Sequence, residues 1–200
     1  MIVIDEHRLQ VFDGDSFNHL FSIGSDQQGN QSSQFNDPRG VDCNPQGDMI
    51  VADTDNHRMQ IFDVKGKHLH SFGSQGSNNN QFSYPHDVCV DVKTNRMFIT
   101  DFNNNRLSVW SVDGSQVIHT FTVQQYPTGI CIDPYTHHIV VSCYGSNDIK
   151  VFDVKNWELI QQFGSEGSQP GQFNDPYGVC IDDRGVLIVV ARFNFLVQLF

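Results

Sequence analysis

One short segment built around a proline recurs along this chain of 200 residues. The copies are FNDPRGVDC from Phe35, FSYPHDVCVD from Phe82, FNDPYGVCID from Phe173 and a weaker YPTGICID from Tyr126. Successive prolines of these copies lie 47, 42 and 49 residues apart. A period of this size is typical of folds in which each repeat is one supersecondary unit stacked against its neighbours.

Two further segments recur between the prolines and define the content of each unit. One is MIVADTDNHRMQIFD from Met49, repeated as MFITDFNNNRLSVWS, IVVSCYGSNDIKVFD and LIVVARFNFLVQLF; the other is LHSFGSQG from Leu69, repeated as IQQFGSEG. Each unit therefore predicts four short strands, the first after the proline and the others, in the second unit, near 50–53, 59–62 and 68–72. Gly, Asn, Asp and Pro between the runs predict turns. Four strands per repeat of this length indicate a β-propeller blade and no substantial helix.

The motifs GSEGSQPGQFNDPYGVCID, at 164–182, and VADTDNHRMQIF, at 51–62, resemble the NHL-repeat family. The resemblance covers nearly the whole chain and implies an all-β, NHL-type propeller, usually closed by six four-stranded blades. We expect one partial propeller over residues 1–200, with blades near 1–34, 35–81, 82–124, 125–172 and 173–200. That is about four and a half blades, an incomplete part of a six-bladed ring. In the first blade we expect IDEHRLQVF to be the third strand. The alternative is a closed four-bladed ring.

Composition excludes several classes of function. The formal net charge is −11 and the pI is about 5.0, whereas non-specific nucleic-acid binders are usually basic because they neutralise phosphates. We therefore expect no DNA partner. No apolar run is long enough to span a membrane, and no basic region precedes an apolar one as in a signal peptide. Five dispersed cysteines form no CxxC motif, which favours reduced thiols in a cytoplasmic protein.

The sequence offers little for catalysis. Cys89, Cys131 and Cys180 each lie four residues after a repeat proline, where a small buried side chain explains them. A related propeller, the amidating lyase, places His ligands around its axis, and only His86 occupies such a place in this chain. We expect no catalytic residues, no metal, no cofactor and no enzyme activity.

The resemblance implies a binding function. In tripartite-motif ubiquitin ligases an NHL propeller recruits targets, so we expect a platform for a protein partner, with substrate recruitment for a ubiquitin ligase as one form of it. The alternative is single-stranded RNA, held by the arginines at 39, 58, 106 and 192 and by Phe102, Tyr177 and Phe193, although Asp53, Asp55 and Asp101 would repel phosphate. A propeller hydrolase or lyase is a remote alternative.

The residue after each repeat proline should start the innermost strand and ring the mouth of the central channel. These residues differ between blades: Arg39, His86, Thr128 and Tyr177. The turns between second and third strands should extend the same face with Asp55, His57, Phe102, Asn103, Tyr144 and Phe193. Arg and aromatic residues are the types that most often anchor a partner. We also expect two structural ion pairs across these turns, Asp53 with Arg58 and Asp101 with Arg106.

Overall fold

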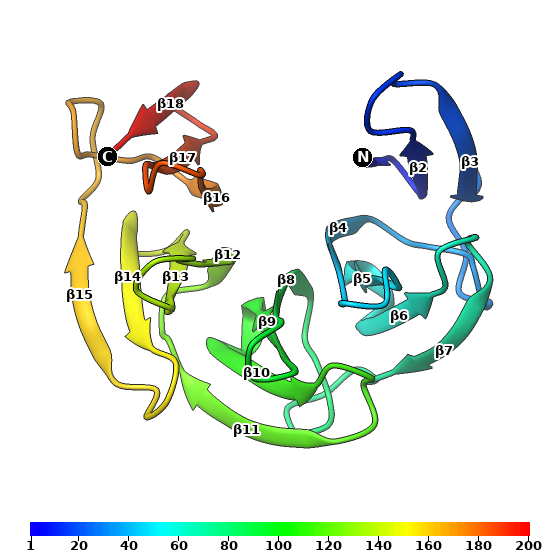
Figure 1. The fold of residues 1–200 in the computed structure, drawn as a ribbon. Helices are drawn as coiled ribbons and strands as arrows, with labels where there is room; N and C mark the ends of the chain where they lie inside the picture. The colour runs from blue at the N-terminus through cyan, green and yellow to red at the C-terminus, as the bar shows by residue number, and fades with distance from the viewer.

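A computed structural model describes residues 1–200 as five antiparallel sheets that follow one another around an open arc (Figure 1). The first sheet has three strands, β1 (Ile2–Asp5), β2 (Arg8–Phe12) and β3 (His19–Gly24). The second has β4 (Pro38–Cys43), β5 (Met49–Asp53), β6 (Arg58–Phe62) and β7 (His68–Phe72). The third has β8 (Pro85–Asp91), β9 (Arg96–Asp101), β10 (Arg106–Ser111) and β11 (Val117–Thr122). The fourth has β12 (Pro127–Ile132), β13 (His138–Cys143), β14 (Asp148–Asp153) and β15 (Leu159–Phe163). The fifth has β16 (Pro176–Ile181), β17 (Leu187–Ala191) and β18 (Leu196–Leu199).

The predicted all-β propeller is confirmed. Strands pair in sequence order within each sheet, and the only helical elements are two three-residue 3₁₀ turns, η1 (Thr54–Asn56) and η2 (Phe102–Asn104). The first and last sheets lie on either side of the opening of the arc (Figure 1). None of the helical segments is long and apolar enough to cross a membrane.

One expectation about the first blade is wrong. The string IDEHRLQVF is not a single strand, because Asp5 pairs with Arg8 across a tight turn and the string therefore contains the end of β1 and all of β2. The turn is possible because Glu6 adopts the left-handed conformation, with φ of 52°.

The core lies between neighbouring blades. Phe82, which begins the loop motif before the third blade, is fully buried and packs with Met59 of the second blade and Trp110 of the third. Phe35 and Phe173 are buried in the same way at the other long loops. Each such ring removes a large apolar area from water, so the repeated Phe positions stabilise the stacking of blades.

Close packing of the innermost strands requires glycine in the middle of the arc. A Cβ on Gly129 of β12 would lie 2.3 Å from the carbonyl oxygen of Tyr177, in the next blade, and one on Gly40 of β4 would lie 2.4 Å from the Asp87 carboxylate. The equivalent Gly178 of β16 has nothing within 4 Å. Close packing therefore requires glycine at this position in the second and fourth blades and not in the fifth, whereas the third blade has Asp87 there.

Candidate partner-binding face

The predicted site residues lie at one end of the blades. In each of the last four blades the proline that starts the innermost strand pairs with the last residue of the second strand, as Pro38 does with Asp53 and Pro176 with Ala191. The loop that enters the innermost strand and the turn between second and third strands therefore share one face. We call this end of the propeller the rim face.

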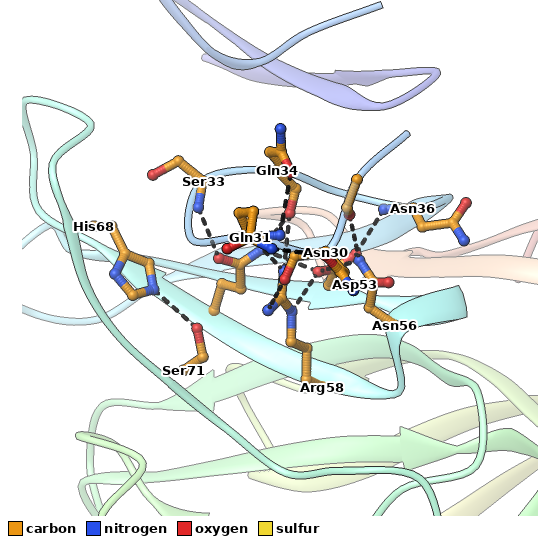
Figure 2. Close-up of polar contacts among 12 residues, drawn as sticks. Asn30, Gln31, Ser33, Gln34, Asn36, Asp53, Asn56, Arg58, His68 and Ser71 are labelled. Carbon is orange, nitrogen blue, oxygen red and sulfur yellow. Dashed lines mark hydrogen bonds and ion pairs between the residues drawn. The ribbon is translucent and has the colours of Figure 1, made fainter. Parts of the chain in front are cut away.

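Two ion pairs lie at the ends of the strands next to the rim face, beneath its surface. Nε of Arg58 lies 2.7 Å from Oδ2 of the fully buried Asp53, and Nε of Arg106 lies 2.8 Å from Oδ2 of the fully buried Asp101. The structure thus brings both expected pairs into contact. Asp53 also accepts hydrogen bonds from the Asn36 backbone N–H and from the side chains of Asn56 and Gln60, so the carboxylate is fully partnered (Figure 2).

Each arginine of these pairs also holds a loop. The Nη atoms of Arg58 donate to the carbonyl oxygens of Asn30, Gln31 and Gln34, in the loop that connects the first and second blades (Figure 2). Arg106 makes the same three kinds of contact with Ser77, Asn78 and Gln81. The pair is therefore a clamp between a hairpin and the preceding interblade loop, and its role is structural.

Two other ion pairs lie at this end of the first and fourth blades, and the sequence spacing did not predict them. In the first blade Asp5 pairs with Arg8 at 2.8 Å and accepts from Gln10, but the shorter turn reduces the spacing from five residues to three. In the fourth blade, where Cys143 and Asp148 replace the Asp and the Arg, Asp148 pairs instead with Lys150 at 2.8 Å. Asp5 and Arg8 face each other on paired strands, whereas Asp148 and Lys150 lie two residues apart on β14. Arg8 donates to Asp5 and Asp26, and Lys150 donates to Ser146 and Asp148, so neither pair holds a preceding interblade loop.

His57 has a structural place in the rim. Its Nδ1 accepts the backbone N–H of Tyr84 at 3.0 Å, and the ring is 9% exposed. His7, Asn105 and Asn147 accept equivalent N–H groups of the residues before the other three repeat prolines. Burial lowers the pKa of His57, which favours the neutral ring that can accept this bond. The residue connects consecutive blades and offers a partner little surface.

Three of the four residues that ring the channel contact one another across it. Nη1 of Arg39 lies 3.0 Å from Nε2 of His86 and donates to the hydroxyl of Tyr177 at 2.9 Å. Nη2 of Arg39 forms an ion pair with Oδ2 of Asp37 at 2.7 Å. Residues far apart in the chain thus form one polar network at the mouth of the channel.

The Arg39 contact determines the state of His86. A guanidinium can only donate, so Nε2 of His86 accepts and we assign the proton of the neutral ring to Nδ1. Burial, with smaller effects from Arg39 and Arg192, lowers the pKa of His86 to about 3. The ring stacks on Phe102 with centroids 4.1 Å apart and an interplanar angle of 11°.

Thr128 does not belong to the exposed face. Its side chain is 2% exposed, and its hydroxyl lies 2.9 Å from both the carbonyl oxygen of Pro176 and the hydroxyl of Ser142. The short side chain reaches only the neighbouring backbone, whereas the longer side chains of Arg39 and Tyr177 extend over the channel. The Thr128 hydroxyl therefore connects neighbouring blades and offers a partner little surface.

Aromatic side chains dominate the exposed part of the rim face. Tyr126 and Tyr144 are each 40% exposed and Phe193 is 58% exposed. Phe102 lies between them, with its ring centroid 5.1 Å from that of Tyr126 and 6.2 Å from that of Tyr144. Sequence reasoning did not select Tyr126, although it directly precedes a repeat proline as Tyr84 does.

The charged groups of this face have both signs. The guanidinium of Arg192 lies 5.5 Å from the ring centre of Tyr177 and 6.0 Å from that of Phe193, without an ion-pair partner. Asp55 and Asn103 are exposed on the turns of the second and third blades. Asp175, which the sequence reasoning also passed over, is 3% exposed beside this cluster, and burial raises its pKa. No three His, Cys, Asp or Glu side chains converge as a metal site would require.

Comparisons with known proteins agree with this architecture. A family model described as a 6-bladed beta-propeller matches residues 41–138. Protein brain tumor of Drosophila melanogaster is 42% identical over 73 residues, which are 36% of this chain and 7% of that protein. The B-box type zinc finger protein ncl-1 of Caenorhabditis elegans is 54% identical over 39 residues, which are 20% of this chain and 5% of that protein.

A solved structure shows the same fold without a close relationship in sequence. Hydrazine Synthase of Kuenenia stuttgartiensis superposes with a TM-score of 0.64 at 18% sequence identity. The superposition covers 84% of this chain and 44% of that one. At this identity the similarity concerns the arrangement of strands alone.

Proposed function

Because this chain is a β-propeller of the NHL-repeat kind, we propose that it is a non-catalytic binding platform whose partner is a protein. The observation that carries the proposal is the aromatic surface of the rim face beside the Arg39–Tyr177 network, formed by the exposed Tyr126, Tyr144 and Phe193 and the half-buried Phe102. Tyr, Trp and Arg are the residues that most often dominate binding energy at interfaces.

The surroundings of the aromatic residues support a protein partner. The clamp of Asp101 and Arg106 fixes the hairpin that carries Phe102, so that little conformational entropy is lost there on binding. In a protein that also carries ubiquitin-transfer domains, the platform would recruit substrates. All five cysteines are unpaired, which suits a reducing compartment, and we place the platform in the cytoplasm.

Single-stranded RNA is the second candidate, favoured by the position of Arg192 over Tyr177 and Phe193. A guanidinium beside aromatic faces can serve stacked bases and phosphates. The net charge of −11 and the exposed Asp55 act against phosphate binding. The affinity for RNA would therefore decrease steeply as the salt concentration rises. Arg192→Ala would make this dependence of the affinity on salt less steep.

The proposal is tested by affinity capture with immobilised protein, followed by binding curves for each captured partner. Phe102→Ala and Tyr144→Ala should each weaken binding at least about tenfold, as expected for residues near the centre of an interface. The control is Tyr135→Ala, because Tyr135 is 63% exposed in the turn between β12 and β13, at the opposite end of the blades. Loss of binding in the control with full binding by both rim variants would show that the opposite face is the platform.

A further inference from the structure

A pocket of about 220 Å³ opens at the mouth of the channel on the rim face. Its walls include His86, Phe102, Tyr177 and Phe193, with Arg192 and Asp175 beside them. Pockets for whole drug-sized ligands usually measure about 300–1,000 Å³. This one therefore suits a single side chain or a group of similar size, presented by a larger partner.

Two polar atoms of these walls lack partners. Nδ1 of His86 and Oδ1 of Asp175 make no hydrogen bond, although the residues are only 6% and 3% exposed. Leaving such a group unpaired destabilises the folded protein, so native structures rarely keep one without a reason. Since Arg39 determines the tautomer of His86, its Nδ1–H is an unused donor. The Asp175 carboxylate is an unused acceptor.

The pair of unused groups selects the chemistry of the ligand. The Asp175 carboxylate would repel an anion in this pocket. A cation would be repelled by Arg39 and Arg192 and could not accept the hydrogen bond that the N–H of His86 offers. An uncharged group that offers a carbonyl oxygen to His86 and an N–H to Asp175 satisfies both. A primary amide has this pair of functions on one planar unit, and its faces can pack against Phe102 and Tyr177.

We propose that this pocket binds the side-chain amide of an Asn or Gln residue of the protein partner. The inference rests on the proposed function for the identity of the partner as a protein. A nucleobase edge also combines donors and acceptors, but the exposed Asp55 on this face and the net charge of −11 disfavour the attached phosphates.

The test uses the whole chain, labelled with ¹⁵N in histidine, and small probes in place of a partner. The probes are the acetylated methylamides of glutamine and of glutamate, together with uridine and guanosine. The glutamine probe should shift the Nδ1–H resonance of His86 in a saturable way, and the glutamate probe should bind at least about tenfold more weakly, because its charge faces Asp175.

Two variants test whether the probe binds in this pocket and not elsewhere on the rim face. Asp175→Asn should weaken the glutamine probe about tenfold through loss of a charge-assisted hydrogen bond, and a well-dispersed amide spectrum would show that the variant is folded. Asp183→Asn, in the exposed turn between β16 and β17, should leave binding unchanged. Equal binding of both amino-acid probes, an unaffected Asp175→Asn variant, or binding of a nucleoside in place of glutamine would overturn the assignment. Because partner capture is measured separately, these results would not alter the outcome of the rim-face test.

Discussion

The third and fifth blades carry the same loop motif but anchor it differently. Before the third blade the N–H of Gly76 donates to the carbonyl oxygen of Phe82 at 3.0 Å, and before the fifth the N–H of Gly167 donates to that of Phe173 at 3.0 Å. The loop conformation is therefore the same. In the third blade Asp101 and Arg106 clamp it to the hairpin, whereas Ala191 and Leu196 occupy these places in the fifth.

The difference shows that the loop and its clamp are separable. The sequence of the loop, with its glycines and its buried Phe, is sufficient for the turn. The Asp–Arg pair adds a connection between the loop and the blade that follows it. In the fifth blade only neutral side chains make this connection, such as Asn194, which donates to the carbonyl oxygen of Gly167 at 2.8 Å. We expect the third blade to be the more rigid of the two.

Removal of the buried acid of the clamp should have the largest effect. Asp101→Ala removes the acceptor of the Ser83 backbone N–H and one of the acceptors of Arg106 and of Asn104. Losing one member of a buried ion pair typically costs about 3–5 kcal/mol. Urea unfolding should show a decrease of this size in the free energy of unfolding, and a value within about 0.5 kcal/mol of the exposed control Asp183→Ala would refute the clamp.

Transfer of the clamp into the fifth blade sharpens the comparison. Ala191→Asp alone should destabilise the protein, because position 191 is 1% exposed and the new carboxylate lacks a base. The double variant Ala191→Asp with Leu196→Arg should recover part of the loss, with a coupling of about 1–3 kcal/mol in a double-mutant cycle. If the two substitutions change the free energy of unfolding additively, the clamp requires other residues of the third blade besides the Asp and the Arg.

Glycine on the innermost strands gives a second contrast between internal and last blades. Gly129→Ala should destabilise by about 1–3 kcal/mol, because the new methyl group would overlap the carbonyl oxygen of Tyr177. Gly178→Ala, at the same repeat position in the fifth blade, meets no neighbour and should change stability by less than about 0.5 kcal/mol. Thermal unfolding of both variants provides the measurement, and equal shifts would remove the packing explanation.

The contribution of His86 to the pH dependence of stability should be the smallest of these effects. Its pKa is about 3 in the folded protein and about 6.5 for an unperturbed histidine. The unfolded chain therefore binds more protons between these values, so the contribution of His86 to stability is complete above pH 6.5 and decreases as the pH falls. His86→Phe should remove this part of the pH dependence. The stability of the variant relative to the wild type should therefore be higher at pH 5 than at pH 7.5. A wild-type His86 ring that titrates near pH 6.5 in an NMR experiment would contradict the lowered pKa.

The sequence predicts the repeating parts of this molecule and not the parts that vary. Four strands per unit follow from short β-branched and aromatic runs between turn residues, because backbone pairing and packing impose the same requirements in every blade. The direction of a rim side chain depends on its length and neighbours. Thr128 follows a repeat proline as Arg39 does, yet its hydroxyl is used by Pro176 and Ser142. The ion pair of Asp5 and Arg8 was not predicted because a shorter turn changes the spacing of the acid and the base along the chain.

Hydrogen–deuterium exchange of the chain, free and bound to a captured protein partner, tests the rim face most directly. We predict new protection at the rim turns around 102–105, 144–147 and 192–195, with no change at the opposite turns 92–95 and 133–137. Protection confined to the opposite turns, with unchanged exchange at the rim, would contradict the account.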